Sequence, residues 1–308
     1  MSKGISVCIV NLNGEELIAA YLPKVIESMD NYKWELIFFD NGSDDNSINI
    51  VRELYPPARV LTSPINLGFS KANNIAIKFA SYDYVLLLNT DVVPDKDFLA
   101  PLLKHLESET VFAVAPKMYR FTDELDDGIR FAEFRTGLLT PILNVEKSLR
   151  NETSFTTFFC GGAVLFKKDI FLDLGGFDII YSPYSWEDLD LAYRCWKRGY
   201  QVIYEPASVV HHYREKTARK VFSDSYMRVM VWRNRFIFMW KNLSMPCLAQ
   251  HILHLPVKLV KFLCTGRSLY VVGFLWALNL LPAVMYRRAV ERKYIKRSDY
   301  EIFNLTGA

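Results

Sequence analysis

Short apolar runs alternate with segments of helical spacing through residues 5–90, and no other feature narrows the possible folds of this chain as much. The runs are continuous and contain β-branched residues, which is typical of strands buried on both faces of a parallel sheet. Because helices join the runs, we expect right-handed crossovers in a doubly wound α/β sheet. The predicted strands are Ile5–Val10, Trp34–Phe39, Arg59–Leu61 and Tyr84–Leu88, and the predicted helices are Glu15–Met29, Asp44–Leu54 and Lys71–Phe79.

Polar residues follow three of these strands. They are Asn-Leu-Asn at 11–13, Asp-Asn-Gly at 40–42 and Asn-Thr-Asp at 89–91. Ligands of doubly wound sheets bind beyond the carboxyl ends of the strands, so the three ends together indicate a binding pocket. Asp40 has the chemistry to accept the ring N–H of a base, and Asp91 has the chemistry to hold a divalent cation. Each end taken alone is equally explained as a capped turn, as when Asp91 bonds backbone N–H groups near Pro94.

Several other features argue against particular classes of protein. The first strand-to-helix turn, NLNGEE, has neither the dinucleotide fingerprint GxGxxG nor a P-loop. The net charge of +3 does not indicate a nucleic-acid surface, so no nucleic acid is expected as a partner. The five cysteines form no CxxC pair, and the N-terminus turns polar too early for a signal peptide. We therefore expect reduced thiols in a cytoplasmic protein.

Four segments occur in the order found in family 2 glycosyltransferases: SVCIVNLNGEE, FFDNGSDDNS, NLGFSKANNIAI and LLLNTDVVP. Over residues 5–215 the chain resembles this family, and most closely its bacterial rhamnosyltransferase-like members, which build surface polysaccharide. The resemblance implies the GT-A fold, a Rossmann-like doubly wound mixed sheet, and a nucleotide-sugar donor linked to dTDP, UDP or GDP. The donor-binding residues that it implies are Asn11, Asn13, Asp40, Asn41, Asn66, Lys71, Asn89 and Thr90.

The same resemblance implies a divalent cation, Mg²⁺ or Mn²⁺, held by Asp91 together with a histidine near residue 212. His211 and His212 are adjacent, so in an extended chain they point to opposite sides and one alone can face the site. We expect His212 to be the ligand, with His211 as the alternative. The basic residues that follow are expected either to neutralise the diphosphate or to form a solvated loop; they are Arg214, Lys216 and Arg219.

The segment YSWEDLDLAYRCWKRGY contains a Glu187-Asp188 pair that matches the ED motif of the resembled family. There the aspartate is the general base, which predicts Asp188 as the base of an inverting transfer, ahead of Glu187 and Asp190. Acidic residues in the first turn of a helix are equally explained by the helix dipole. The residues expected on the acceptor side are Gly161, Gly162, Trp186 and Glu187, although paired glycines also make ordinary turns and Trp186 is as readily a core residue.

Further elements are predicted in the second half of the chain. Cys160–Phe166, Val202–Tyr204 and Ser208–Val210 are expected to be strands. Residues 120–158 are polar, which indicates either a flexible surface insertion or a loop over the acceptor site.

Aromatic, apolar and basic residues dominate after residue 225. Leu269–Tyr286 is an apolar run near the lower limit of a membrane span, and it is interrupted by Asn279 and Pro282. Basic residues flank the run on both sides, which favours amphipathic helices lying on anionic lipid at the inner face of the cell membrane. A membrane span and an oligomer interface are the alternatives. We therefore divide the chain into a catalytic domain, residues 1–222, and a helical membrane-associating region, residues 223–308, that brings the site near a lipid-linked saccharide acceptor.

Two residues depart from the family pattern. Leu12 stands where many members have an aromatic residue, and Asn89 replaces the first acid of a full DXD motif. They motivate an alternative hypothesis, a non-catalytic scaffold of a membrane polysaccharide assembly complex. A nucleotidyltransferase is a third hypothesis, against which the missing glycine-rich N-terminal loop argues.

Overall fold

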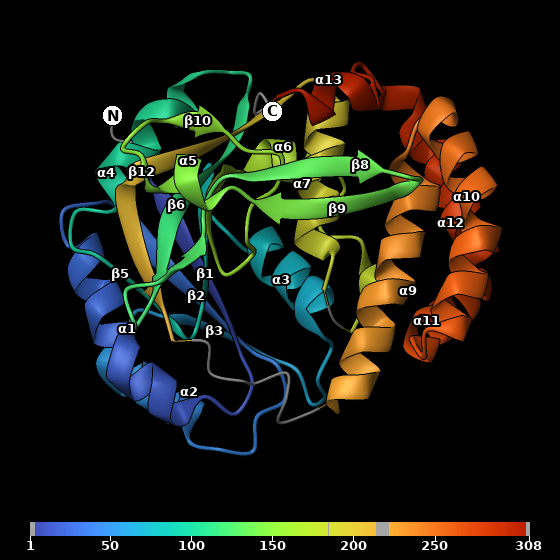
Figure 1. Cartoon of the computed structure of the whole chain (residues 1–308). Coiled ribbons are helices and arrows are strands. Elements are labelled where there is room, and N and C mark those ends of the chain that lie inside the picture. Colours follow the sequence, from blue (N-terminus) through green and yellow to red (C-terminus); the bar gives the residue numbers. More distant parts are fainter. Residues whose placement is uncertain (1–3, 184, 214–221, 306–308) are drawn as a thin grey trace.

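A computed structural model of the chain describes residues 4–183, 185–213 and 222–305. A mixed sheet forms the centre, with the order β10-β12-β6-β11-β4-β1-β2-β3. Helices cover both of its faces, and a layer of C-terminal helices lies on one side of the molecule (Figure 1). The predicted cations Arg214, Lys216 and Arg219 lie outside the described residues.

The first half of the sheet agrees with the sequence-based prediction. Four parallel strands pair in the order β3-β2-β1-β4, joined by helices. These elements are β1 (Ile5–Asn11), α1 (Glu15–Met29), β2 (Trp34–Asp40), α2 (Ser47–Leu54), β3 (Arg59–Thr62), α3 (Phe69–Lys78) and β4 (Tyr84–Asn89). Helix α2 begins later than predicted because the Asp45 carboxylate accepts hydrogen bonds from the N–H groups of Glu15 and Ser47, which holds the preceding residues in a turn.

Strand β1 shows why these runs are continuously apolar. Ile5, Val7 and Ile9 pack in a core with helix α1, whereas Cys8 packs in a second core on the other face with helix α3. A strand that is covered on both faces has no solvent side and therefore no polar alternation. The sheet thus separates two cores, and its strand ends remain the place where polar residues can gather.

The second half of the sheet differs more from the prediction. Strand β11 (Ala163–Lys167) runs antiparallel between β4 and β6 (Val111–Arg120), and β6 was not among the predicted strands. The two short strands predicted at 202–210 are one strand, β12 (Gln201–His212), whose pairing with β6 shifts register between Glu205 and Val209. The irregularity interrupts the apolar pattern, which explains why the sequence indicated two strands.

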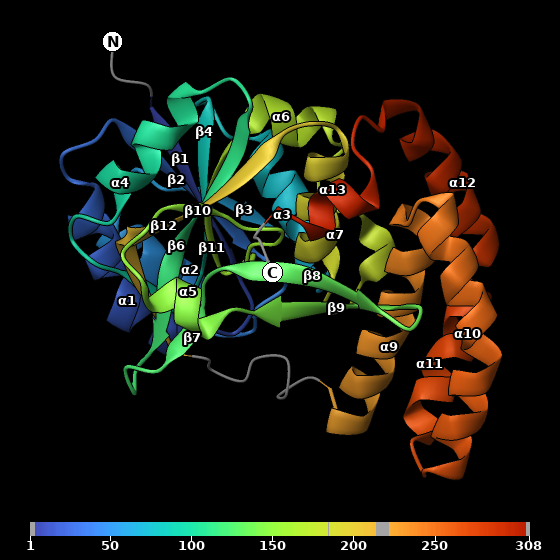
Figure 2. The ribbon, with the colours of Figure 1, turned by 45° about the horizontal axis from the view of Figure 1, so that its top comes forward.

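Residues 120–158 are not an irregular loop, so that prediction was wrong. They form β7 (Leu125–Asp127), a hairpin of β8 (Arg130–Arg135) and β9 (Leu138–Leu143), helix α5 (Val145–Leu149) and β10 (Ser154–Phe155). The charged side chains of this segment pair locally, as in the ion pair between Arg130 Nε and Asp127 Oδ1 at 2.5 Å. A polar segment can therefore form regular structure here. In Figures 1 and 2 the tip of the β8–β9 hairpin reaches the C-terminal helices.

Short elements complete the catalytic half. They are β5 (Val92–Pro94), α4 (Leu99–Leu103), η1 (Lys104–Glu107), α6 (Lys168–Asp173), η2 (Ile179–Tyr181) and α7 (Glu187–Lys197).

The C-terminal region is helical, as predicted. It comprises α9 (Asp224–Asn242), α10 (Met245–Cys264), α11 (Ser268–Leu278), α12 (Leu281–Glu291), η3 (Arg292–Tyr294) and α13 (Asp299–Phe303). The predicted run Leu269–Tyr286 is not one helix: it is divided between α11 and α12, and the pair Ser268–Leu278 and Leu281–Tyr294 bends by 68°. Within the described residues, Met245–Cys264 is the single helix that is long and apolar enough to cross a membrane unaided.

Candidate active site

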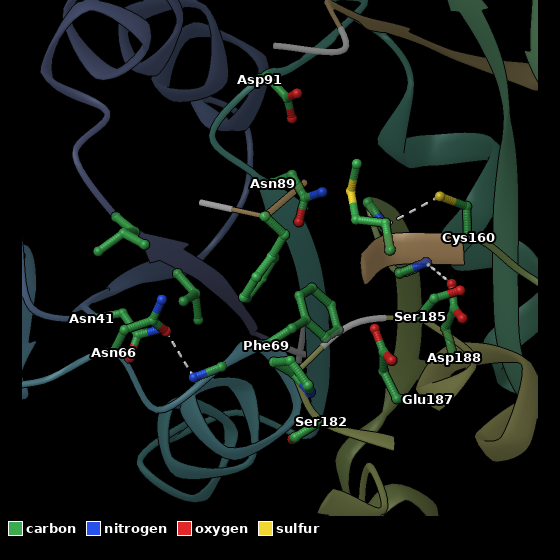
Figure 3. A pocket seen from close by; sticks show the side chains of 18 of the residues that line it. Asn41, Asn66, Phe69, Asn89, Asp91, Cys160, Ser182, Ser185, Glu187 and Asp188 are labelled. Carbon is green, nitrogen blue, oxygen red and sulfur yellow. Dashed lines mark hydrogen bonds between the residues drawn. The ribbon is translucent and has the colours of Figure 1, made fainter. Parts of the chain in front are cut away.

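A cavity of about 1450 Å³ opens at the carboxyl ends of β1 and β4. Figure 3 shows Asn41 and Asn66 on one side of it and Glu187 and Asp188 on the other. Most of the predicted site residues line this cavity, and they come from segments that are far apart in the sequence. The predicted residues found in the lining are Asn11, Asn41, Asn66, Asn89, Thr90, Asp91, Gly161, Gly162, Glu187, Asp188 and His212.

The side of the cavity next to β2 is built on two paired amides. Asn41 Nδ2 donates to Asn66 Oδ1 at 2.9 Å, and Asn41 Oδ1 accepts from the N–H of Leu67 at 2.8 Å. Asn66 Oδ1 also accepts from the N–H of Gly68 at 2.8 Å. These bonds fix the loop that leads into α3, so the amides shape the rim of the cavity.

Three predicted donor residues lie outside the lining. Asp40 is buried behind Asn11, whose Nδ2 donates to it at 3.3 Å, and it also accepts from the N–H of Ser43 at 3.0 Å. Asn13 adopts a positive φ of 51°, and its N–H donates to Ser43 Oγ at 2.9 Å. Lys71 is exposed on α3. None of these three side chains lines the cavity, and their role in donor binding stays a prediction.

Asp91 and His212 meet in the cavity wall. His212 Nε2 lies 3.3 Å from Asp91 Oδ2, and its Nδ1 lies 2.8 Å from Asp126 Oδ2. Burial lowers the pKa of His212, but hydrogen bonds and charges from Asp126 and Asp91 outweigh it and raise the pKa to about 9. The neighbouring His211 faces away and contacts Asp95 at 3.1 Å. Of the two histidines, His212 is therefore the one beside Asp91.

This pair has the chemistry of an incomplete metal site. A carboxylate oxygen is a ligand that Mg²⁺ and Mn²⁺ prefer, and an imidazole nitrogen suits a transition-metal ion better than Mg²⁺. Asp126 bonds the second ring nitrogen of His212 as an outer-shell partner does. Among the described residues no cluster of three such side chains forms, so a metal here would need further ligands from a diphosphate and water. The protein residues fit a cation on these terms.

Asp188 lies at the start of α7 and faces β11. Its Oδ2 accepts from the N–H of Gly161 at 3.0 Å, and its Oδ1 accepts from the N–H of Leu189 at 2.8 Å. Burial raises the pKa of Asp188 against the opposing effect of these hydrogen bonds. Beside it, burial and the charge of Asp188 raise the pKa of Glu187 to about 8. Glu187 lines the cavity, and its Oε2 is buried with no hydrogen-bond partner among the described residues.

The two glycines are required by close approach. A Cβ on Gly161 would stand 3.0 Å from Phe69 Cζ and 3.5 Å from Asp188 Cβ, and one on Gly162 would stand 3.3 Å from Asn89 Nδ2. The chain just before β11 therefore passes close to Phe69, Asp188 and Asn89 because neither glycine has a side chain. Trp186 is outside the lining; it is buried, and its ring packs 5.2 Å from that of Phe238.

Helix α9 holds the segment that carries Glu187 and Asp188 from both sides. Before α7, Asn234 Nδ2 donates to the carbonyls of Tyr181 and Ser185 at 2.7 and 2.8 Å. Within α7, Lys241 Nζ lies 2.9 Å from Asp190 Oδ2. The sequence contained no local signal for this role, since each contact joins segments about fifty residues apart.

The first half of α9 also forms one wall of the cavity. The lining residues that sequence reasoning did not identify include Phe69, Arg120, Met227, Arg228, Val231 and Trp232. The predicted division at residue 222 therefore separates two parts that share one cavity, and it stays a prediction.

Comparison with known proteins identifies the family. The sequence model of Glycosyl transferase family 2 matches residues 6–175, which is more than half of the chain. The chain belongs to this family. A pre-mycofactocin glycosyltransferase of Mycobacterium tuberculosis is 29% identical over 168 residues, which are 53% of this chain and 35% of the relative. A poly-beta-1,6-N-acetyl-D-glucosamine synthase of Staphylococcus aureus is 23% identical over 209 residues, which are 67% of this chain and 49% of the relative.

This family 2 chain thus spans a third to a half of the length of these curated relatives. The mannosyltransferase PcManGT from Pyrobaculum calidifontis, solved with GDP-Man and Mn²⁺, has a similar structure with a TM-score of 0.58 at 20% identity. The match covers 96% of this chain and 89% of the mannosyltransferase, which confirms the predicted GT-A fold.

Proposed function

We propose that the protein is an inverting glycosyltransferase that moves a sugar from a nucleotide diphosphate to a hydroxyl group of a saccharide. The observation that carries this proposal is that one cavity brings together Asp91 and His212, which lie 3.3 Å apart, and the carboxyl group of Asp188, whose pKa burial raises. Transfer from a nucleotide sugar needs both a means to stabilise the leaving diphosphate and a base for the acceptor. Family membership and the Mn²⁺ bound to PcManGT support the same reading.

The donor would lie along the carboxyl ends of the parallel strands. Asn41 and Asn66 would border the nucleoside, and Asn89 and Thr90 would lie toward the diphosphate. Asp91 and His212 would hold Mg²⁺ or Mn²⁺, which supplies positive charge against the diphosphate. Asp40, Asn13 and Lys71 are proposed as donor residues on the family resemblance alone.

Asp188 would act on the acceptor. Its carboxylate takes the proton of an acceptor hydroxyl as that oxygen forms a bond to the anomeric carbon, while the bond from that carbon to the diphosphate oxygen breaks. A single in-line displacement of this kind inverts the anomeric centre. Glu187 also lines the cavity and would accept a hydrogen bond from the acceptor, provided that its buried Oε2 becomes accessible when the acceptor binds. Gly161, whose N–H bonds Asp188, and Gly162 would lie on the acceptor side of the cavity beside the base.

The acceptor that we propose is a lipid-linked saccharide of cell-surface polysaccharide synthesis, met at the cytoplasmic face of the membrane. The likeness to a poly-N-acetylglucosamine synthase supports a polysaccharide product, and the apolar C-terminal helices support a site near lipid.

Calorimetric titration with UDP, dTDP, GDP, CDP and ADP, each with and without Mn²⁺, tests the donor half of the proposal. We expect one nucleotide to bind in a metal-dependent manner and Asp91→Ala to lose that binding. If no nucleotide binds under any condition, the proposal fails and the scaffold hypothesis takes its place. That hypothesis rests on the departures at Leu12 and Asn89, both of which line the cavity.

Replacement of Asp188 by Asn tests the catalytic half. The amide keeps the shape but removes the base, so we expect transfer to fall about 10²–10⁴-fold while nucleotide affinity stays unchanged. Turnover is measured as nucleoside diphosphate released in the presence of acceptor. Normal turnover by Asp188→Asn would refute the assignment of the base.

A further inference from the structure

Helix α10 has an outward face that is mostly apolar between Ile252 and Leu263, with Lys261 exposed beside the apolar side chains. The side chains on this face include Ile252, Leu253, Val257, Val260 and Leu263, which are 57%, 76%, 72%, 61% and 58% exposed. They recur at the three- and four-residue spacing of one helical stripe. A surface helix of a water-soluble domain turns polar residues outward, whereas α10 exposes this apolar stripe in addition to burying Cys247 and Leu248 on its inner face.

The inner face of α10 is fastened to the rest of the protein. His251 is buried and accepts a hydrogen bond from Trp240 Nε1 of α9 at 3.1 Å through its Nε2. Its Nδ1 donates to the carbonyl of Gly137, at the tip of the β8–β9 hairpin, at 2.6 Å. Lys258 Nζ bonds Thr136 Oγ1 of the same tip at 2.9 Å. A helix that crossed the bilayer would have to give up these contacts, so the structure favours α10 lying along the protein surface.

The charge around the apolar face has one sign. Residues 245–280 contain Lys258, Lys261 and Arg267 and no aspartate or glutamate. Cations beside an apolar stripe suit a surface that is apolar within and negatively charged at its edge, which is the arrangement of an anionic lipid bilayer. A second copy of the chain would present cations to cations at the same rim. The charge pattern therefore favours lipid over a self-association surface.

We infer that the outward face of α10 inserts into the interface of an anionic membrane with the helix axis in the membrane plane. The neighbouring helices expose further apolar side chains, among them Leu275 on α11 and Tyr286 on α12, at 53% and 70%. Helix α9 joins this layer to the cavity: Trp232 lines the cavity, and its ring also packs 4.6 Å from Tyr270 of α11. This in-plane attachment to the membrane goes beyond the proposed transfer reaction, and it would hold the cavity wall formed by α9 near the membrane surface.

Flotation with preformed vesicles tests this inference. The purified chain is mixed with vesicles of phosphatidylcholine alone, or of equal parts phosphatidylcholine and phosphatidylglycerol. We expect strong co-flotation with the anionic vesicles. The double variant Leu253→Asp with Val257→Asp removes two apolar side chains and adds two negative charges, so its partition coefficient should fall about a hundredfold or more. Lys261→Gln should weaken binding about fivefold, and to the anionic vesicles alone.

The matched control is Leu149→Asp, which is 51% exposed and belongs to α5, a helix that lies away from α10 in both views (Figures 1 and 2). It should float as the unaltered protein does. The inference is overturned if the unaltered chain floats with neither vesicle, or if the double variant floats equally well. It is also overturned if sedimentation equilibrium without lipid reveals a dimer that the double variant dissociates, since a second copy then covers the face.

Two further measurements separate the remaining readings. Alkaline carbonate should release the protein from cell membranes, whereas retention would indicate a spanning helix and overturn the in-plane seat. Calorimetric nucleotide binding by the double variant should equal that of the unaltered protein. Loss of flotation with nucleotide binding intact therefore reports on the membrane seat, and loss of nucleotide binding in both proteins reports on the proposed function.

Discussion

At the scale of single residues, the two neighbouring carboxyl groups of Glu187 and Asp188 differ in their surroundings. Asp188 accepts two backbone N–H bonds, which favour its ionised form, whereas one oxygen of Glu187 is buried without a partner among the described residues. Two like charges this close do not both ionise readily, so the hydrogen bonds decide which one does. Asp188 is thus the group that ionises first as the pH rises. Glu187, whose pKa is raised to about 8, stays neutral at lower pH.

The pH dependence of transfer should reflect the raised pKa of Asp188. A base must be ionised, and burial raises the pKa of this carboxyl, so the ionised fraction falls at a higher pH than for a free aspartate of pKa about 3.9. We expect kcat/KM to decline on the acid side of neutrality well before that value. Profiles of kcat/KM against pH measure this, with nucleotide affinity at each pH as the control. A flat profile down to the range of free aspartate would contradict it.

Glu187→Gln should behave unlike Asp188→Asn. At neutral pH the Glu187 carboxyl is protonated because its pKa is about 8, and an amide has nearly the same shape and charge as a protonated carboxyl. We expect this variant to keep kcat within about tenfold of the unaltered enzyme, against a loss of about 10²–10⁴-fold for Asp188→Asn. Parallel kinetics of the two variants decide the matter. Equal losses in both would mean that Glu187 takes part in the proton transfer.

At the scale of elements, α7 and α9 form one charged unit inside the protein. Asp190 of α7 accepts bonds from Tyr181, Arg194, Lys241 and Asn242 at 2.7 to 2.9 Å. Burial raises the pKa of Asp190, but Lys241 and Arg194 outweigh it and hold the pKa well below its usual value. A fully paired carboxylate two residues after the proposed base anchors the first turn of α7.

Lys241→Met should destabilise the fold. It leaves the buried carboxylate of Asp190 without one of its cations, and breaking such a pair costs about 3–5 kcal/mol of unfolding free energy. Urea unfolding at neutral pH measures the change. The matched control is Lys78→Met at the exposed end of α3, which should change stability by less than about 0.5 kcal/mol. A loss in Lys241→Met no larger than in the control would show that the pair contributes nothing.

The ion pair of Asp190 with Lys241 also determines whether acid stabilises or destabilises the fold. A carboxyl whose pKa is depressed in the folded state stabilises the fold above the unfolded pKa, about 3.9 for aspartate, and this stabilisation is lost as the pH falls toward the folded value. The unaltered protein should therefore lose stability below about pH 4, and Lys241→Met should lose less over the same interval because the pKa of its Asp190 is less depressed. Urea midpoints across this range test the difference; parallel curves would contradict it.

At the scale of the whole molecule, the C-terminal helices and the catalytic sheet share one core. Phe236, Phe238 and Met239 of α9 are fully buried in the cluster that also contains Tyr193 and Trp196 of α7. Asp299 near the C-terminus accepts from Tyr193 at 2.7 Å, so even the last helix is tied to α7. The helical layer is therefore structural for the site as well as a candidate membrane seat.

A fragment of residues 1–222 should not fold into an active domain. Each fully buried large apolar side chain of α9 stabilises the fold by about 1.5–3 kcal/mol, so several together approach the whole stability of a domain, about 5–15 kcal/mol. Circular dichroism melting of the fragment should lack a cooperative transition, in contrast to the full chain. A cooperative melt together with nucleotide binding would instead support an independent domain that ends at residue 222.

Local patterns were sufficient for the first half of the fold. Continuous apolar runs and helical spacing are properties of neighbouring residues, and burial acts on them in the same way in any doubly wound sheet. They placed β1 to β4 within a residue or two and put Asn11, Asn89 and Asp91 at the strand ends. The ED motif likewise located the start of α7, because acidic residues suit a helix N-terminus whatever surrounds it.

Only the tertiary structure decided which distant segments meet. Whether Trp186 faces an acceptor or the core depends on Phe238 of α9, and whether His211 or His212 faces Asp91 depends on how β12 pairs with β6. The cavity wall formed by α9 and the outward apolar face of α10 likewise depend on which segments pack together. The sequence alone determined which residues are apolar, charged or turn-forming; packing determined their neighbours, because contact free energy depends on three-dimensional proximity, which local order does not encode.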